Sequence, residues 1–144
     1  MKKINIIYWT MSGNTLIMAD CIADGAKAAG AAVNVCNVSE ATPATALDAD
    51  MTVLGCPAMG AEALEETEFE PFFARLLPEL AGRTVALFGS YGWGGGEWMR
   101  TWQQRVEAVG GKVFGGEGLI INGRPDEDGM IRCEDFGRAL AHSE

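Results

Sequence analysis

The chain alternates short apolar or β-branched runs with longer segments whose apolar residues recur at helical spacing. Runs that predict strands cover 4–9, 32–38, 51–56 and 84–89, with one interrupted strand over 112–114 and 119–122. Helical spacing covers 15–29, 69–80 and 98–109, and a last short helix is expected over 134–142. Strands that alternate with helices indicate a parallel sheet with right-handed crossovers. We therefore expect an α/β fold, a three-layer sandwich around a five-stranded parallel sheet of order 2-1-3-4-5.

Length and composition favour a folded globule and exclude several classes of function. The 144 residues, of which 48% are hydrophobic, suit a single domain over 1–144. A formal net charge of −9 opposes nonspecific binding to nucleic acid or anionic lipid, because both require a basic surface. No apolar run predicts a signal peptide or a membrane span. Four dispersed cysteines without a Cys-x-x-Cys pair, and one histidine, argue against a metal site and suit a reducing cytoplasm.

Three loops of unusual composition follow predicted strands at the edge where such sheets bind ligands, namely 10–14, 57–68 and 90–96. The first contains hydroxyl and amide side chains at a helix start but no Lys or Arg. It could hold a phosphate through helix dipoles, or its side chains could merely cap the helix. It lacks the Gly-Lys-Ser/Thr ending of a P-loop and the glycine spacing of a dinucleotide fingerprint. Trp93, between glycines, favours a ligand contact, whereas Trp98 and Trp102 share a helical face and favour the core.

Acidic side chains are concentrated over 62–70. These nine residues contain five carboxylates and no basic group: Glu62, Glu65, Glu66, Glu68 and Glu70. The run can be a solvated loop and helix start, or a surface that steers positively charged partners, and both interpretations can hold. His142, the single histidine, is far in sequence from the three loops, and no nucleophile has an adjacent base. Catalytic residues are therefore not expected.

Four segments together resemble the short-chain flavodoxins of anaerobic bacteria. They are YWTMSGNT at 8–15, LGCPAMG at 54–60, EETEFEPF at 65–72 and VALFGSYGWG at 85–94. The resemblance covers nearly the whole chain in order and spacing. It implies a flavodoxin-like fold, non-covalently bound flavin mononucleotide (FMN), and a function as a low-potential one-electron carrier between redox proteins, without substrate turnover. Negative charge near the flavin is expected to lower the second reduction potential.

The resemblance also implies roles for single residues. Met59 and Trp93 would flank the isoalloxazine ring, Glu62 would hydrogen-bond its pyrimidine edge, and Gly60 would control the hydrogen bond at flavin N5. The phosphate contacts would be Thr10, Ser12, Asn14 and Thr15. The expected set of cofactor contacts also includes Met11, Gly13, Pro57, Ala58, Ala61, Ser90, Tyr91, Gly92 and Gly94.

The sequence departs from the family pattern at four positions. Met11 stands where a small residue is usual, and Pro57 stands where a hydroxyl residue often assists the phosphate. Ala61 and Gly95 occupy positions where Asp or Asn is expected. These departures bear on phosphate contacts and redox tuning rather than on the identity of the cofactor.

The expected partners are redox proteins with basic docking faces, and the expected state is a cytoplasmic monomer. An FMN-dependent quinone or nitro-compound reductase is the competing class, but such enzymes usually carry longer insertions around the ring and often dimerise. A phosphate-accepting response regulator would require acidic residues after the first strand and an Asp after the third. Thr10 and Pro57 occupy those regions instead.

Overall fold

A single parallel sheet forms the centre of the computed structural model, which describes residues 1–143. Its strands are β1 (Lys3–Tyr8), β2 (Ala32–Asn37), β3 (Met51–Gly55), β4 (Thr84–Tyr91), β5 (Lys112–Val113) and β6 (Leu119–Asn122). The order is β2-β1-β3-β4-β5, and β6 also pairs with β4. The predicted order is confirmed, and the interrupted fifth strand is present as two pieces that pair with opposite ends of β4.

Burial along the strands explains their places in the sheet. All five residues of β3 are buried, as a central strand covered on both faces requires. Residues of β2 are exposed or half-buried, as suits an edge strand. Between β5 and β6 the chain turns through Gly115 and Gly116, whose φ angles of 73° and 82° lie in the left-handed region that glycine adopts readily.

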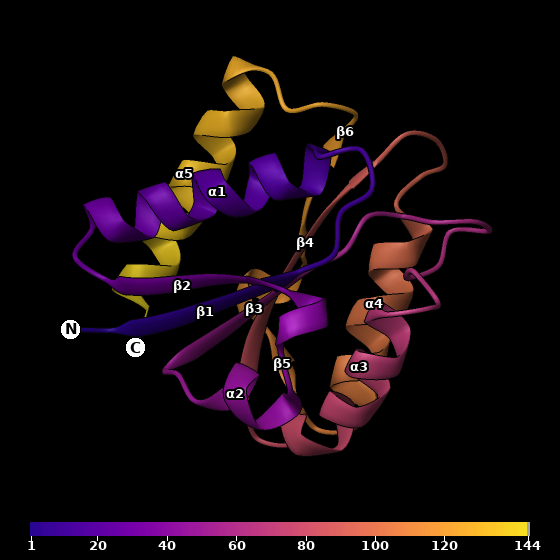
Figure 1. Ribbon diagram of the computed structural model, residues 1–144, viewed down its shortest axis with the longest axis horizontal. Helices are drawn as coiled ribbons and strands as arrows, with labels where there is room; N and C mark the ends of the chain where they lie inside the picture. Colours follow the sequence, from indigo (N-terminus) through magenta and orange to yellow (C-terminus); the bar gives the residue numbers. More distant parts are fainter. Residues whose placement is uncertain (144) are drawn as a thin grey trace.

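Helices cover both faces of the sheet (Figure 1). One face carries α1 (Asn14–Ala28) and α5 (Glu127–His142), and the other carries α2 (Pro43–Leu47), α3 (Phe69–Leu76) and α4 (Glu97–Ala108), with a 3-10 turn over Leu77–Leu80 after α3. Two hydrophobic clusters fill the two spaces between sheet and helices. Trp98 and Trp102 are each 1% exposed, so their predicted place in the core is confirmed.

The main departures from the sequence expectations lie at the start of the last helix, in the connection after β2 and at the end of β4. The last helix begins at Glu127 rather than 134, because the Asp126 side chain caps it by accepting the Gly129 N–H at 2.7 Å. The connection after β2 contains α2, which starts with a capping box between Thr42 and Thr45. β4 continues through Ser90 and Tyr91 because these residues pair with β6, so both expected site residues lie on a strand and not in a loop.

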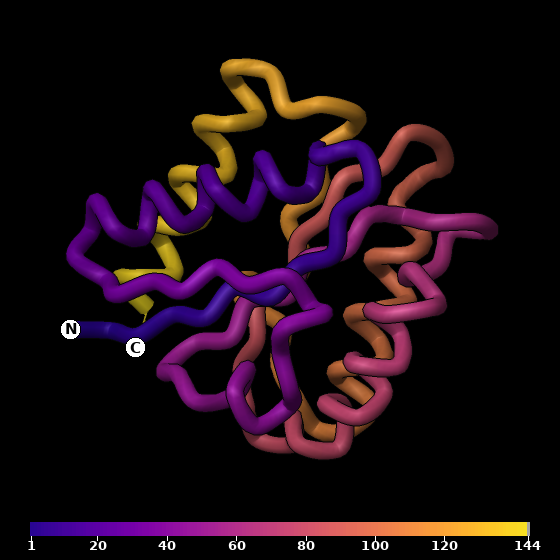
Figure 2. The backbone as a smooth tube through the Cα atoms, viewed as in Figure 1, coloured from indigo at the N-terminus to yellow at the C-terminus, as the bar shows by residue number. Residues whose placement is uncertain are grey.

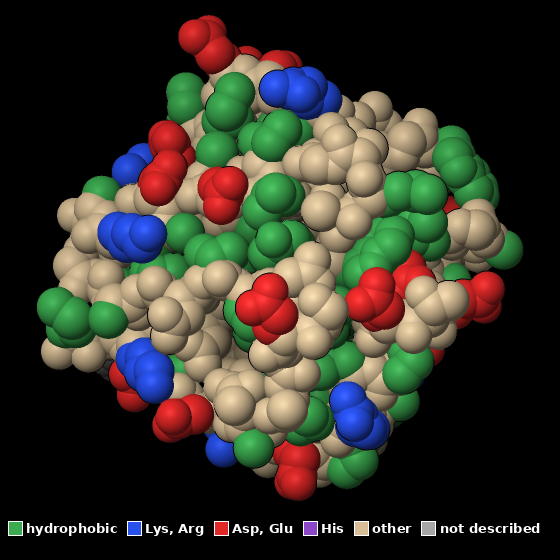
Figure 3. All heavy atoms as spheres, viewed as in Figure 1, with side chains coloured by type: hydrophobic (Ala, Val, Ile, Leu, Met, Phe, Trp, Pro, Cys, Tyr) green, Lys and Arg blue, Asp and Glu red, His purple; other side chains and the backbone are tan. Residues whose placement is uncertain are grey.

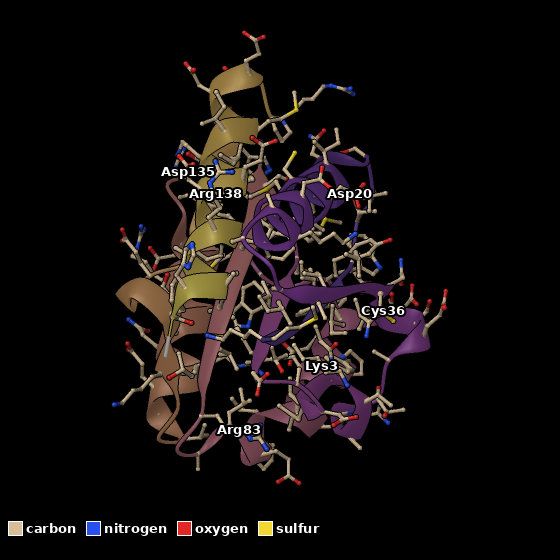
Figure 4. The ribbon with its side chains drawn as sticks, turned by 90° about the vertical axis from the view of Figure 1, so that its left-hand side faces the viewer. Lys3, Asp20, Cys36, Arg83, Asp135 and Arg138 are labelled. Atoms are coloured by element: carbon tan, nitrogen blue, oxygen red, sulfur yellow. The ribbon has the colours of Figure 1, made fainter. Side chains whose placement is uncertain are left out.

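Helices α1 and α5 touch through their backbones. A Cβ added at Gly25 would lie 1.9 Å from the Glu134 carbonyl oxygen, and one added at Gly137 would lie 2.0 Å from the Ile22 carbonyl oxygen. Farther out on α5, Arg138 pairs with Asp135 at 2.6 Å on the exposed surface (Figure 4). The two glycines therefore fix how closely α1 and α5 approach each other.

The start of α3 depends on one buried carboxylate. Glu65 is 6% exposed, and its oxygens accept the backbone N–H groups of Thr67, Glu68 and Phe69 at 2.8–2.9 Å and the Thr67 hydroxyl. Burial by itself raises the pKa of Glu65, but these hydrogen bonds outweigh it and hold the pKa below the usual value. The charged form is therefore the one that organises this helix start.

We predict that Gly137→Ala destabilises the protein by about 1–3 kcal/mol, because the added methyl group forces the backbones of α5 and α1 apart. Urea unfolding of the FMN-free protein, followed by far-ultraviolet circular dichroism, measures the change. Gly95→Ala is the control, since an added Cβ there meets nothing within 4 Å. Equal unfolding midpoints for wild type and Gly137→Ala would contradict the close helix contact.

We also predict that Glu65→Gln destabilises the protein at neutral pH. Because the folded-state pKa is depressed, the stabilisation is fully present above the unfolded value of about 4.3 and is lost as the pH falls through the folded pKa. Urea unfolding at neutral and acidic pH should show the difference from wild type shrinking with acid. The exposed Glu66→Gln is the matched control, and a difference that does not depend on pH would contradict this role of the charge.

Candidate functional site

A cavity of about 190 Å³ opens at the carboxyl edge of the sheet. Figure 2 shows the loops after β1, β3 and β4 leaving the sheet toward this same side. The lining residues are Thr10, Met11, Ser12, Asn14, Thr15, Pro57, Ala58, Met59, Ser90, Tyr91, Gly92 and Gly123. The structure therefore brings residues from all three predicted loop regions together around one cavity.

Some expected contacts lie in the same loops but do not line this cavity. They are Gly13, Gly60, Ala61, Glu62, Trp93 and Gly94. An adjoining cavity of about 520 Å³ meets the first at Met59 and is lined in part by Gly60 and Ala61. Gly123 was not predicted. Its position directly after the last strand, whose carboxyl end reaches the same edge, is the signal that could have identified it.

The N-terminus of α1 points to an anion site. The helix begins at Asn14 after Gly13, whose φ is 96°, and no side chain caps its first N–H groups. The Thr10 hydroxyl oxygen accepts a hydrogen bond from the Gly13 N–H at 3.2 Å. The first turn contains no acidic residue, and Asn14 and Thr15 line the cavity. An uncapped helix start with surrounding hydroxyl and amide groups fits a phosphate group, whose charge the helix dipole stabilises.

A buried pair of hydroxyl groups fixes this helix start to the sheet. Thr15 and Ser90 are 1% and 5% exposed, and their hydroxyl oxygens are 3.0 Å apart. The Ser90 N–H also points to the Thr15 hydroxyl oxygen at 3.4 Å. Sequence reasoning identified both residues but not their contact, because 75 positions separate them in the chain.

A small hairpin follows β3 and forms one side of the site. Met59 and Ala63 exchange both backbone hydrogen bonds, at 2.8 and 2.9 Å, and the three residues between them form the tip. Gly60 and Glu62 have φ angles of 52° and 51°. Glycine adopts this left-handed backbone at little cost, whereas for Glu62 it is strained.

Two large apolar side chains are exposed on the loops after β1 and β4. Trp93 is 62% exposed and Met11 is 74% exposed. Figure 3 shows hydrophobic side chains gathered at the edge of the molecule where the loops after β3 and β4 project. An exposed indole and an exposed, polarizable thioether on these loops suit contact with a flat aromatic ligand.

Most of the acidic run has a structural partner. Glu62 accepts the Glu97 N–H at 3.0 Å, and Glu65 organises the start of α3. Glu70 forms a two-pronged ion pair with Arg105, at 2.7 and 2.8 Å, which joins α3 to α4. Glu66 and Glu68 are exposed. The helix-start interpretation therefore explains much of the run, and the outward charge comes from fewer residues than the sequence alone suggests.

Other chemistry finds little support within residues 1–143. No group of three or more His, Cys, Asp or Glu side chains there is placed to hold a metal ion. The cysteines are unpaired thiols, and burial raises the pKa of Cys56 and Cys133 to about 12, which makes them poor nucleophiles. In the same range, no helix combines the length and apolar character that a membrane crossing requires.

Comparison with known proteins agrees with this geometry. The sequence model of the flavodoxin family matches residues 6–137. Flavodoxin of Megasphaera elsdenii is 45% identical over 138 residues, which is 96% of this chain and 98% of that protein. Flavodoxin of Clostridium beijerinckii is 44% identical over 139 residues, which is 96% of this chain and 99% of that protein.

Solved structures agree as well. The solution structure of two-electron reduced M. elsdenii flavodoxin superposes with a TM-score of 0.88 at 44% identity, covering 97% of this chain and 99% of that one. A flavodoxin from the domain Archaea gives a TM-score of 0.85 at 25% identity, with 96% of each chain covered. With sequence and fold matched over nearly its whole length, the chain belongs to the flavodoxin family, as an FMN-binding electron carrier that turns over no substrate of its own.

Proposed function

We propose that FMN binds at the carboxyl edge of the sheet, with its phosphate at the N-terminus of α1. Thr10, Ser12, Asn14 and Thr15 would hold the phosphate. The observation that carries this placement is the helix start without a side-chain cap, which lines a cavity rich in hydroxyl groups. The loop contains no cationic side chain, so backbone N–H groups and hydroxyl groups supply the attraction.

The isoalloxazine ring would lie against the hairpin and the loop after β4. Met59 and Trp93 would contact its faces, Glu62 its pyrimidine edge, and Gly60 the N5 edge. When bound, the cofactor supplies the one-electron chemistry. The chain's residues bind and orient the ring, exclude water from part of it, and set the charge around it. We include residues 1–144 in this single FMN-binding domain.

Charge around the site supports a low reduction potential and basic partners. The net charge is −9, and Glu62, Glu66 and Glu68 belong to the loops and helix start beside the proposed ring site. Carboxylates near the ring disfavour added negative charge, which lowers the second reduction potential. The same field attracts redox proteins with positive docking faces and raises their association rates. We propose that the protein acts in this way as a monomer in the cytoplasm.

Two departures from the family pattern acquire a physical meaning here. Pro57 lines the cavity but has neither an N–H group nor a hydroxyl, so it cannot donate a hydrogen bond from that side. Met11 also lines the cavity, and its side chain is largely exposed. The phosphate contacts would therefore come mainly from the hydroxyl and backbone groups of the first loop and α1.

Trp93→Ala should weaken FMN binding by about 1 kcal/mol, or roughly fivefold in Kd, through loss of the aromatic contact. Trp93→Phe is the matched control, because it keeps an aromatic face at the same position. Fluorescence titration of the FMN-free protein measures both affinities. An unchanged Kd for Trp93→Ala would remove this side chain from the ring site.

Thr15→Ala should weaken FMN more than riboflavin, since only FMN offers a phosphate to the start of α1. Thr15→Ser retains the hydroxyl group that meets Ser90 and should bind FMN nearly as well as wild type. Calorimetric titration with both ligands separates phosphate recognition from ring recognition. Equal losses for FMN and riboflavin would mean that Thr15 serves only to hold α1 against β4.

A further inference from the structure

Glu62 combines an unfavourable backbone conformation with a distant contact. Among residues 1–143 it is the one non-glycine residue with positive φ, at 51°. A glutamate resists this conformation far more than glycine does. Backbone strain of this kind persists only where other contacts compensate for it. The side chain of Glu62 makes such a contact.

The Glu62 carboxylate caps a helix that lies 35 positions away in the sequence. Helix α4 starts after Gly96, which has a φ of 85° and no side chain to accept a hydrogen bond. Glu62 Oε1 accepts the Glu97 N–H at 3.0 Å and so supplies the missing cap. The Glu97 carboxylate itself pairs with Arg100 at 2.6 Å. A side chain of the hairpin therefore accepts the hydrogen bond of the first N–H group of α4.

The carboxylate fits against Gly94 because that residue has no side chain. A Cβ added at Gly94 would lie 2.5 Å from Glu62 Cδ and 2.6–2.8 Å from its oxygens. Gly94 also has a φ of 83°. Contact with Gly94 and the bond to Glu97 together place the hairpin tip against the loop that carries Trp93.

We propose that Glu62 is a positioning residue, a clamp that joins the Met59–Ala63 hairpin to the loop after β4. It ties the segment carrying Met59 to the segment carrying Trp93. Among residues 1–143 the Glu97 N–H engages only Oε1 of Glu62, so this contact leaves Oε2 unused. The consequence for FMN rests on the proposed function. There the contacts of Glu62 would hold the segments that carry Met59 and Trp93 in place on either side of the ring, which lowers the ordering cost of binding.

Amide hydrogen exchange of the full chain without FMN tests the clamp. In Glu62→Ala the Glu97 amide should exchange about fivefold faster or more, as expected for loss of a helix cap of ordinary strength. Gly94→Ala should produce a similar change, because its methyl group displaces the carboxylate. In the double variant the effects should not add, since both substitutions remove one contact. Glu62→Gln keeps the size and shape of the side chain. Its comparison with Glu62→Ala shows whether the faster exchange reflects a general loss of folding.

Glu66→Ala is the matched control, because it removes one carboxylate from the same acidic run and leaves this contact intact. Unchanged Glu97 exchange in both Glu62→Ala and Gly94→Ala would overturn the clamp, as would an equal effect from Glu66→Ala. FMN affinity is then measured separately. Faster Glu97 exchange with unaltered FMN affinity would uphold the clamp and overturn the placement of FMN between the two loops.

Discussion

The uncapped N-terminus of α1 is the constraint around which the carboxyl edge of the protein is organised. Its first N–H groups have no side-chain partner, and a helix end of this kind is costly unless water or a ligand satisfies it. The helix cannot retreat from the cavity, because Gly25 places its backbone against α5 and Thr15 meets Ser90 of β4. Packing against α5 and β4 thus keeps the first N–H groups of α1, the proposed phosphate site, in place.

The acidic side chains illustrate how one composition serves structure and function together. The acidic side chains behind the net charge of −9 repel one another in a compact chain. Several of these carboxylates offset part of the repulsion by accepting hydrogen bonds from backbone N–H groups or by pairing with arginine. Glu65 begins α3, Glu62 caps α4, and Glu70 joins the two helices through Arg105. Helices α3 and α4, beside the proposed ring site, are therefore ordered by the same charges that make the surface negative. Removing charge from this region would alter loop order as well as potential.

Much of the architecture could be predicted because its signals are local. The apolar continuity of β3 and the alternation of strands with helices were enough for the strand order, and the helical spacing of Trp98 and Trp102 identified the core. The start of α5 was missed because its cap, Asp126, lies in a polar stretch without apolar periodicity. Contacts such as Thr15 with Ser90 and Glu62 with Glu97 depend on tertiary geometry. No local sequence pattern predicts these contacts.

A nuclear magnetic resonance titration of the FMN-free protein with FMN tests the central claim most directly. Amide signals of residues 12–16, 58–62, 90–94 and 123 should shift together and saturate at one equivalent of FMN. A cavity of about 470 Å³ at the opposite edge of the sheet, lined in part by Lys2 and Arg83, provides an internal comparison. The amide signals of the residues that line this second cavity should not shift. Shifts confined to that cavity, with the N-terminus of α1 unaffected, would contradict the account.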